Sequence, residues 1–257
     1  MPTRIVSVPL TIFFFTLLGL ALGSFGNVLI LRLEKGESLF GRSHCMHGKH
    51  RLGILDLIPV LSYAFLGGRC RTCGRHISIQ YPIIEILSGA LFALSAALYP
   101  SYLFIAILTA FLLFALLLSA AYDVLHQRLP DFFVDGVAVP ALILTYFTGT
   151  IFSSLLGLSI VLVWFGGQWV LSKGRAVGTG DIFLASALAL WLGFRGTIAM
   201  LLFSYIAGAI ITLLLLGLGV ISMKQKRIAF GPFLAIGAVL SFFGLGQELL
   251  RVLIPFA

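Results

Sequence analysis

Two aspartates, Asp123 and Asp181, are the residues of this sequence best placed to do chemistry. Asp123 ends one long apolar run and Asp181 begins another. Counting the runs places both acids on one face of a membrane at one depth, where carboxylates cost free energy and are usually functional. Two facing carboxylates can hold one proton between them: the charged one deprotonates a water and the neutral one polarises a carbonyl. The pair predicts aspartic peptide hydrolysis that needs no metal or cofactor.

Other roles for these acids stay open on the residues alone. Asp181 follows Gly178-Thr-Gly180, whose glycines permit close backbone approach, yet Asp is also a favoured helix N-cap. Asp123 could be a solvated acid at headgroup level, although an acid at a helix C-terminus opposes the macrodipole. A proton-coupled membrane transporter is one alternative function, and it predicts acids near the bilayer midplane. A non-catalytic pilus or secretion assembly factor is another.

The elements that carry these acids are predicted to be membrane helices. Of the 257 residues, 60% are apolar and 10% charged, whereas soluble folds keep roughly a quarter charged. We expect an all-α, polytopic transmembrane helical bundle of about eight helices with a small Cys-containing insertion. The domains are a first transmembrane helix at 1–32, a cytoplasmic insertion at 33–80 and a transmembrane catalytic bundle at 81–257. The apolar runs lie near 7–31, 81–99, 102–122, 132–149, 152–172, 182–193, 197–221 and 230–253.

The distribution of cations sets the orientation. Lys and Arg number 17 against 9 Asp and Glu, and eight of these cations lie within 32–80. The positive-inside rule therefore makes this segment and both aspartates cytoplasmic. Anionic membrane lipid is then a more economical partner than nucleic acid. The run 182–193 is short for a crossing and could turn back, which leaves the topology after it open.

Several ordered motifs resemble the bacterial type IV prepilin peptidases, a family of Gly-x-Gly-Asp membrane aspartic proteases. The family's first-helix signature is similar to Gly19-Leu-Ala-Leu-Gly-Ser-Phe-Gly-Asn27 of this chain. The family's cytoplasmic segment is similar to Ile58-Pro-Val-Leu-Ser62, Gly68-Arg-Cys-Arg-Thr-Cys-Gly74 and Tyr81-Pro-Ile-Ile-Glu85. The catalytic motifs resemble Asp123-Val-Leu-His-Gln-Arg-Leu-Pro-Asp131 and Gly178 to Asp181. Phe230-Gly-Pro-Phe-Leu-Ala-Ile-Gly237 also matches the family pattern.

The resemblance implies a reaction, a substrate and a location. Asp123 and Asp181 would be the catalytic pair, with Gly178, Gly180, Pro130 and Asp131 supporting the motifs. The enzyme would cleave the basic leader of prepilins or pseudopilins at the cytoplasmic face of the bacterial inner membrane. Many members then methylate the new N-terminus with S-adenosylmethionine. Many also carry a Lys two positions after the second Asp, where this chain has Phe183. Neither the oligomeric state nor the particular prepilin follows from the sequence.

The cysteines suggest a zinc site in the insertion. The family commonly carries Cys-x-x-Cys twice, and this chain has Cys70-Arg-Thr-Cys73 but Cys45-Met-His-Gly48. Three thiolates and an imidazole from His47 or His50 would make an acceptable tetrahedral site. The alternatives are an empty site held by packing, or a redox pair without the surrounding pattern that such a pair needs.

Three other acids have weaker predictions. Asp131 is expected to cap the fourth helix after Pro130, with Asp135 on the same face one turn later, and either could instead contact a basic leader. Glu85 lies about a turn into the second helix, where it is either a dipole-stabilised acid or a weak candidate for binding the methyl donor.

Overall fold

The computed structural model describes residues 7–39, 41–45, 48, 50–220 and 229–244 and confirms the all-helical prediction. Within these residues, six helices are long and apolar enough to cross a membrane, and α9 (Gly231–Phe242) is a shorter apolar helix. The chain forms two compact units, residues 1–117 and 118–257. The six candidate spans are α1 (Val8–Lys35), α3 (Gln80–Leu98), α4 (Leu103–His126), α5 (Asp131–Thr148), Ile151–Ser172 and α8 (Thr179–Gly217).

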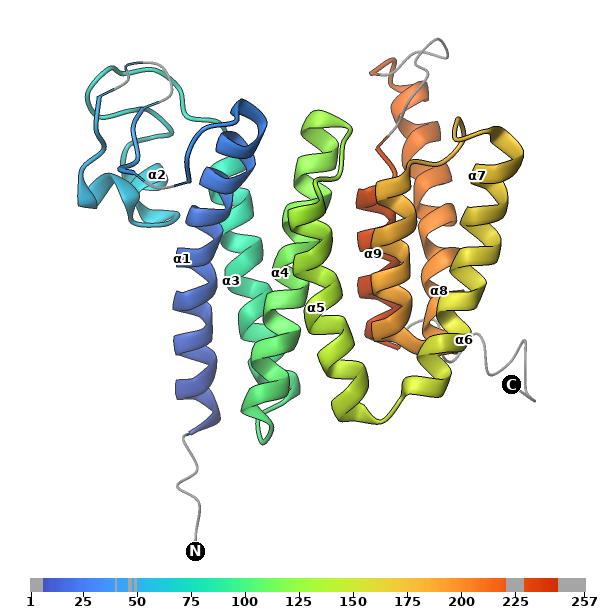
Figure 1. The fold of residues 1–257 in the computed structure, drawn as a ribbon. Coiled ribbons are helices and arrows are strands. Elements are labelled where there is room, and N and C mark those ends of the chain that lie inside the picture. Colours follow the sequence, from blue (N-terminus) through green and yellow to red (C-terminus); the bar gives the residue numbers. More distant parts are fainter. Residues whose placement is uncertain (1–6, 40, 46–47, 49, 221–228, 245–257) are drawn as a thin grey trace, which may run out of the picture. The chain divides into compact units, whose positions relative to one another are not determined.

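In the first unit, α1 and α3 pack side by side because glycines let the two backbones meet (Figure 1). A Cβ at Gly19 would lie 2.6 Å from the Ser88 carbonyl oxygen, and one at Gly23 would lie 2.7 Å from the Glu85 Cα. Small residues serve the same purpose at helix interfaces in membranes generally. This interface fixes the height of Glu85 beside α1.

Helix α1 is longer than the apolar run 7–31 and crosses the predicted domain boundary at 32/33. It continues to Lys35 and ends at Gly36, whose φ of 63° gives a left-handed C-cap. The buried Arg32 guanidinium donates hydrogen bonds to the carbonyls of Ser38, Leu39 and Arg42. The cation that marks the start of the polar segment in the sequence therefore belongs to the last turn of the helix and satisfies the chain that leaves it.

In the second unit, α5 is followed by one span in three parts: α6 (Ile151–Val161), a π-helical turn η2 (Leu162–Gly166) and α7 (Gly167–Ser172). This confirms a crossing near 152–172. Helix α8 contains a non-helical residue, Gly193, with φ 69° and ψ −172°. Helix α8 therefore consists of two helices, 179–192 and 194–217.

The first half of α8 runs in the same direction as α5. At its start, Gly180 packs against Leu129, which lies just before α5. At its end, the Leu190 carbonyl accepts a hydrogen bond of 2.6 Å from the Thr145 hydroxyl, near the end of α5. The run 182–193 thus crosses to the end of the unit where α5 finishes, which settles the question of a turn back.

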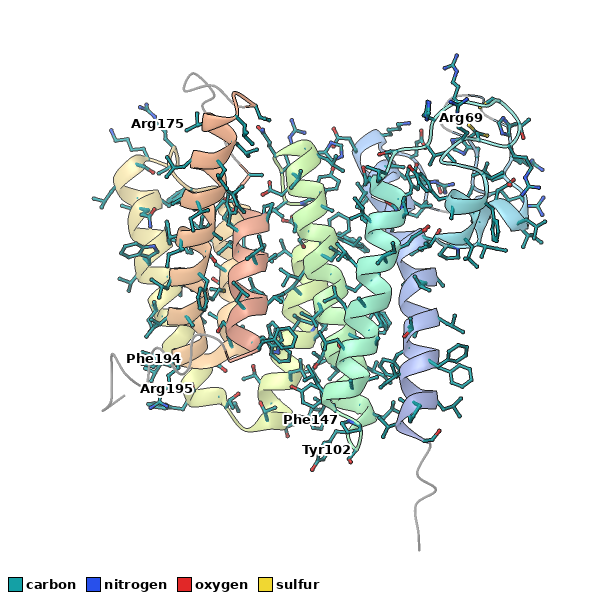
Figure 2. All side chains as sticks on the ribbon, turned by 180° about the vertical axis from the view of Figure 1, so that it is seen from behind. Arg69, Tyr102, Phe147, Arg175, Phe194 and Arg195 are labelled. Carbon is teal, nitrogen blue, oxygen red and sulfur yellow. The ribbon has the colours of Figure 1, made fainter. Side chains whose placement is uncertain are left out.

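The second half of α8 runs beside the 151–172 span instead. Gly157 of α6 lies against Thr197, and Trp164 Nε1 donates a hydrogen bond of 2.9 Å to the Tyr205 hydroxyl. A tight turn at Gly149 joins α5 to α6, so these two helices run in opposite directions. Because one half of α8 follows α5 and the other follows the 151–172 span, the two halves are also antiparallel. Figure 2 shows Arg195 at the end of this unit opposite Arg175. The predicted runs 182–193 and 197–221 are therefore separate spans, as expected; the last predicted run, 230–253, is described to residue 244.

Candidate active site and metal centre

Asp123 lies in the last turn of α4 and is buried, with 5% of its surface exposed. Its carboxylate oxygen Oδ2 accepts a hydrogen bond of 2.8 Å from the backbone N–H of Gly231, the first residue of α9. The N–H groups of a first helical turn have no partner within the helix, so Gly231 has this donor to give. The alternative of a solvated, inert headgroup acid is excluded by this burial.

Asp181 lies in the first turn of α8 and is half-buried. The N-cap of this helix is Gly178, so the capping interpretation of Asp181 was wrong by three residues. Its carboxylate instead has the Gly178 backbone amide as a hydrogen-bonding partner. Gly180 brings this turn against the loop that follows α4, because a Cβ there would lie 2.8 Å from the Leu129 Cβ.

The structure brings Asp123 and Asp181 to the same end of the second unit. The two carboxyl groups are near enough to interact electrostatically. Each is held by a backbone N–H from a glycine, Gly231 for the first and Gly178 for the second. Acids this close do not both ionise cheaply, so the pair can carry one proton and serve as acid and base at once.

Asp131 does not cap α5, which corrects the expectation for this acid. Pro130 occupies the N-cap position with extended backbone, Asp131 is the first helical residue, and no side-chain cap hydrogen bond forms. Asp131 and Asp135 are both exposed at the end of the unit that holds the acid pair. Pro130 still fixes where α5 begins, because its ring cannot continue a helix backward.

The insertion folds as two similar loops, each closed by an antiparallel bridge: His44 to Arg51 and Arg69 to His76. The Cys45 N–H donates to the His50 carbonyl at 2.9 Å, and the Cys70 N–H donates to the Arg75 carbonyl at 2.8 Å. Cys45 thus corresponds to Cys70. By the same register, Gly48 occupies the place that Cys73 holds in the other loop.

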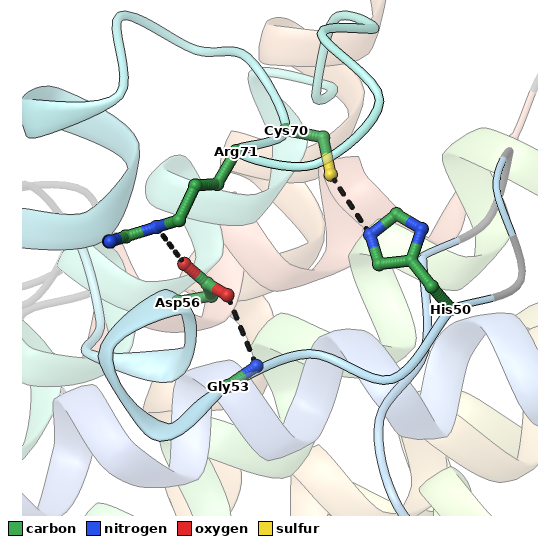
Figure 3. A network of polar contacts seen from close by, with 5 residues as sticks. All are labelled: His50, Gly53, Asp56, Cys70 and Arg71. Atoms are coloured by element: carbon green, nitrogen blue, oxygen red, sulfur yellow. Dashed lines mark hydrogen bonds and ion pairs between the residues drawn. The ribbon is translucent and has the colours of Figure 1, made fainter.

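The three cysteines meet between these loops as free thiols whose Sγ atoms all lie within 4.8 Å of one another. The Cys45 and Cys73 Sγ atoms are 3.7 Å apart, and His50 Nε2 is 3.4 Å from the Cys70 Sγ (Figure 3). Zn–S and Zn–N bonds of about 2.3 and 2.0 Å in a tetrahedron require edges of roughly 3.8 and 3.5 Å. The Cys45–Cys73 and Cys70–His50 distances match these edges, and the three thiols form a group that could hold a metal ion; His50 contacts Cys70 and is not within 4.8 Å of all three thiols. His47 lies outside the described residues.

Gly48 explains how His50 reaches the Cys70 thiol. A Cβ at position 48 would lie 2.6 Å from His50 Nδ1 and 2.9 Å from its Cε1. The imidazole therefore lies where a side chain at 48 would have to go. The absence of a side chain at position 48 leaves the room that the histidine uses.

The thiols also respond to nearby backbone groups. The Cys73 and Thr72 backbone amides hold the pKa of the Cys70 thiol below its ordinary value, although burial acts in the opposite direction. The Arg75 amide lowers the pKa of Cys73, but desolvation and the Cys45 and Cys70 thiols outweigh this effect, so the pKa of Cys73 is raised.

A salt bridge also connects the second loop to the segment between the loops: Arg71 Nε is 2.9 Å from Asp56 Oδ1. The other Asp56 oxygen accepts a hydrogen bond of 3.1 Å from the Gly53 N–H (Figure 3).

A cavity of about 590 Å³ lies between the insertion and the ends of α1 and α3, within the first unit. Glu85 lines it and is 6% exposed, so it is not a surface acid stabilised by the helix dipole alone. Its carboxylate accepts a hydrogen bond of 2.7 Å from the Val60 N–H and a further one from the Ser24 side chain. Val60 has a φ of 64°, a conformation that β-branched residues rarely adopt.

The long apolar helices define a multi-pass membrane protein, and two acids held by glycine amides lie together at the ends of these helices. Comparison with known proteins identifies a family of membrane peptidases. Residues 17–99 match the bacterial peptidase A24 N-terminal domain, and residues 110–213 match the type IV leader peptidase family. The chain belongs to the type IV leader peptidase family.

Curated relatives match over most of their length. A prepilin leader peptidase/N-methyltransferase from Dickeya chrysanthemi is 34% identical over 89% of this chain and 92% of its own. One from Dichelobacter nodosus is 33% identical over 93% and 94%. A type 4 prepilin-like proteins leader peptide-processing enzyme from Escherichia coli O78:H11 is 29% identical over 88% and 91%. No solved structure matches the chain.

Proposed function

We propose that this chain is a membrane aspartic endopeptidase that removes the basic leader of type IV prepilins or pseudopilins at the cytoplasmic face of the bacterial inner membrane, with Asp123 and Asp181 as its catalytic residues. The observation that carries the proposal is the meeting of these two acids at one end of the helices. A proton-coupled transporter would place its acids near the midplane. Here the break in α8 is at Gly193, away from both.

Hydrolysis by the pair requires no other group. A water attacks the carbonyl carbon of the scissile peptide and gives its proton to the ionised aspartate, while the protonated aspartate gives its proton to the carbonyl oxygen. A tetrahedral diol results. The C–N bond then breaks as the leaving nitrogen takes the proton from the first aspartate, and the second aspartate recovers a proton from a diol hydroxyl. The pair is then in its starting state.

The charges at this end of the unit suit a substrate that enters from the cytoplasm. Asp131 and Asp135 are exposed at the start of α5, at the end of the unit that holds the acid pair, and neither caps this helix, so they are available to attract a basic leader. Arg128, Lys173 and Arg175 lie at the same end and Arg195 at the other, which supports the cytoplasmic assignment. The apolar helix that follows the leader would pack laterally from the membrane.

The test is cleavage of a prepilin by purified protein in detergent. Asp123→Asn and Asp181→Asn each keep the size of the side chain, and each should abolish leader removal while the protein stays folded. Asp135→Asn is the matched control and should still cut, with at most a raised KM. An Asp181→Asn protein that cleaves at the normal rate would remove the proposal.

The relatives' names also support methylation of the new N-terminus with S-adenosylmethionine, a cofactor that supplies an electrophilic methyl group when bound. The cavity in the first unit fits such a molecule, because drug-sized ligands occupy 300–1,000 Å³. Phe25, Tyr63 and Tyr81 offer ring surface to an adenine, and the buried Glu85 carboxylate complements a sulfonium or ammonium charge. Arg75 lines the same cavity and would pair with the cofactor's carboxylate.

The thiol cluster supports a structural zinc ion held by Cys45, Cys70, Cys73 and His50. Four protein ligands would leave no open position, so the ion would serve folding rather than catalysis. It would join two loops whose own backbone hydrogen bonds, such as Cys45 to His50 and Cys70 to Arg75, each lie within one loop. The peptidase reaction itself needs neither this ion nor another cofactor.

A further inference from the structure

The hydrogen bond from Gly231 to Asp123 joins residues 108 positions apart and is buried. Only a glycine allows it at this length, because a Cβ at position 231 would lie 2.8 Å from Asp123 Oδ2 and 3.4 Å from both Cβ and Cγ. The donor is the first amide of α9, and Pro232 next to it cannot donate. The amide of Gly231 is therefore aimed at one carboxylate oxygen of Asp123.

An aromatic cluster holds the residue just before this amide. The ring of Phe230 lies 5.5 Å from the ring of Tyr205, 5.9 Å from that of Phe165 and 6.3 Å from that of Phe233, measured between centroids. Phe165 is 1% exposed and belongs to the π-helical turn of the 151–172 span. Such turns recur at functional sites, where the extra residue changes the direction of a side chain.

The cluster is itself anchored by hydrogen bonds. The Tyr205 hydroxyl accepts from Trp164 Nε1 at 2.9 Å and from Gln168 Nε2 at 3.3 Å. Further along α9, Gly237 contacts Ser204 and Met200 so closely that a Cβ would collide with both. The 151–172 span and the second half of α8 thus fix the height and rotation of α9, and with them the place of the Gly231 amide.

From these contacts we infer that Gly231 is a positioning residue of the peptidase, whose backbone N–H orients the Asp123 carboxylate toward its partner Asp181, and that Phe230 sets the place of this N–H. The inference rests on the proposed peptidase function. Asp181 on α8 is the titratable group that faces Asp123, and Tyr122 and His126 are those nearest on its own helix. One backbone donor to a charged acceptor corresponds to about a tenfold to hundredfold effect on rate.

The test compares glycine-to-alanine variants by steady-state kinetics per folded enzyme. Gly231→Ala should lower kcat about tenfold to a hundredfold with little change in KM, because substrate binding does not use this amide. The acid limb of its pH–rate profile should move to higher pH, since a carboxylate without its donor holds a proton more tightly. Gly157→Ala is the control: it crowds Thr197 in the same unit, away from Asp123, so it should lower stability and leave kcat per folded enzyme unchanged.

A second variant keeps the test decisive if Gly231→Ala does not fold. Phe230→Leu retains the glycine and removes the ring contacts, and it should give a smaller fall in kcat with the same direction of pH shift. Wild-type kcat and pH profile in the folded variants would overturn the inference while Asp123→Asn remained inactive. An active Asp123→Asn enzyme would instead overturn the proposed function.

Discussion

Asp123 is an acid at the C-terminal end of its helix, where the macrodipole of α4 disfavours a negative charge. The structure supplies the compensation from another element: the N-terminus of α9, of opposite polarity, meets the same carboxylate through Gly231. Asp181 has its compensation built into its own helix, since it lies in the first turn of α8. Each acid thus lies at the N-terminus of a helix, Asp123 at that of α9 and Asp181 at that of α8.

His50 carries a prediction at the same scale. Its imidazole is 3.4 Å from the Cys70 Sγ and takes the space left by Gly48. We expect His50→Ala protein to lose most of the zinc that copurifies with the wild type, because three thiolates without a fourth protein ligand hold the ion less tightly. Metal analysis of purified protein measures this, and His76→Ala, which alters an exposed histidine of the other loop, should retain the metal. Equal zinc in both variants would exclude His50 as a ligand.

Adding the cysteine back offers a complementary variant. Gly48→Cys in the His50→Ala background restores the family's spacing in the first loop and should restore zinc binding. The same substitution with His50 present should crowd the imidazole, because the new Cβ would lie 2.6 Å from Nδ1. Together, the two results show whether His50 is a zinc ligand that a cysteine at position 48 can replace or only a side chain that packs against the thiols.

At the scale of the element, the decisive feature of the second unit is the turn inside α8. Gly193 has a φ of 69°, and a Cβ there would lie 2.7 Å from Ser153 Oγ. That same hydroxyl accepts the Phe194 N–H at 2.9 Å, which satisfies an amide freed by the break. Gly193→Ala should therefore lower the free energy of unfolding by about 1–3 kcal/mol, from the left-handed backbone and the displaced hydroxyl.

Unfolding in detergent, followed by heat or denaturant, measures this loss. Gly166→Ala is the matched control, because Gly166 has helical backbone angles and open space around its Cβ position, so stability should hold or rise slightly. A Gly193→Ala protein as stable as the control would show that the chain can turn here without a glycine.

The sequence predicts the helices and both catalytic candidates because these depend on local patterns: long apolar runs, and acids at their ends. It also predicts the thiol cluster from spacing. The motif around Gly231 matches the family pattern, but the sequence does not predict its hydrogen bond to Asp123, because the two residues are 108 positions apart. The contact of His50 with Cys70 likewise depends on tertiary packing, and the failure of Asp131 to cap α5 depends on which residue takes the N-cap.

At the scale of the whole molecule, the two proposed activities fall in different compact units. The acid pair belongs to residues 118–257, and the cavity with Glu85 belongs to residues 1–117. We expect Glu85→Gln to weaken equilibrium binding of S-adenosylmethionine, because a neutral amide loses the charge that complements the cofactor, while prepilin cleavage continues. Asp181→Asn should do the reverse. Binding of radiolabelled cofactor to purified protein measures the first effect, and unchanged affinity in Glu85→Gln would remove Glu85 from the site.

Orientation in the membrane gives the remaining prediction. Arg175 and Arg195 are both exposed and lie at opposite ends of the second unit (Figure 2). In spheroplasts, a membrane-impermeant maleimide should label Arg195→Cys at once and Arg175→Cys only after permeabilisation. Wild-type protein, whose three cysteines are expected inside, gives the background labelling before and after permeabilisation. Labelling in the opposite order would place the acid pair outside the cell.

The short first half of α8 has a consequence for the lipid around it. Residues 179–192 rise about 21 Å, whereas the hydrocarbon core of a bilayer is about 30 Å thick. A bilayer that meets both ends of so short a segment must thin beside it. The membrane surface would then lie deeper at Asp181 than elsewhere. The attacking water and the leader junction would reach the acid from this thinned region, without a tunnel through the protein.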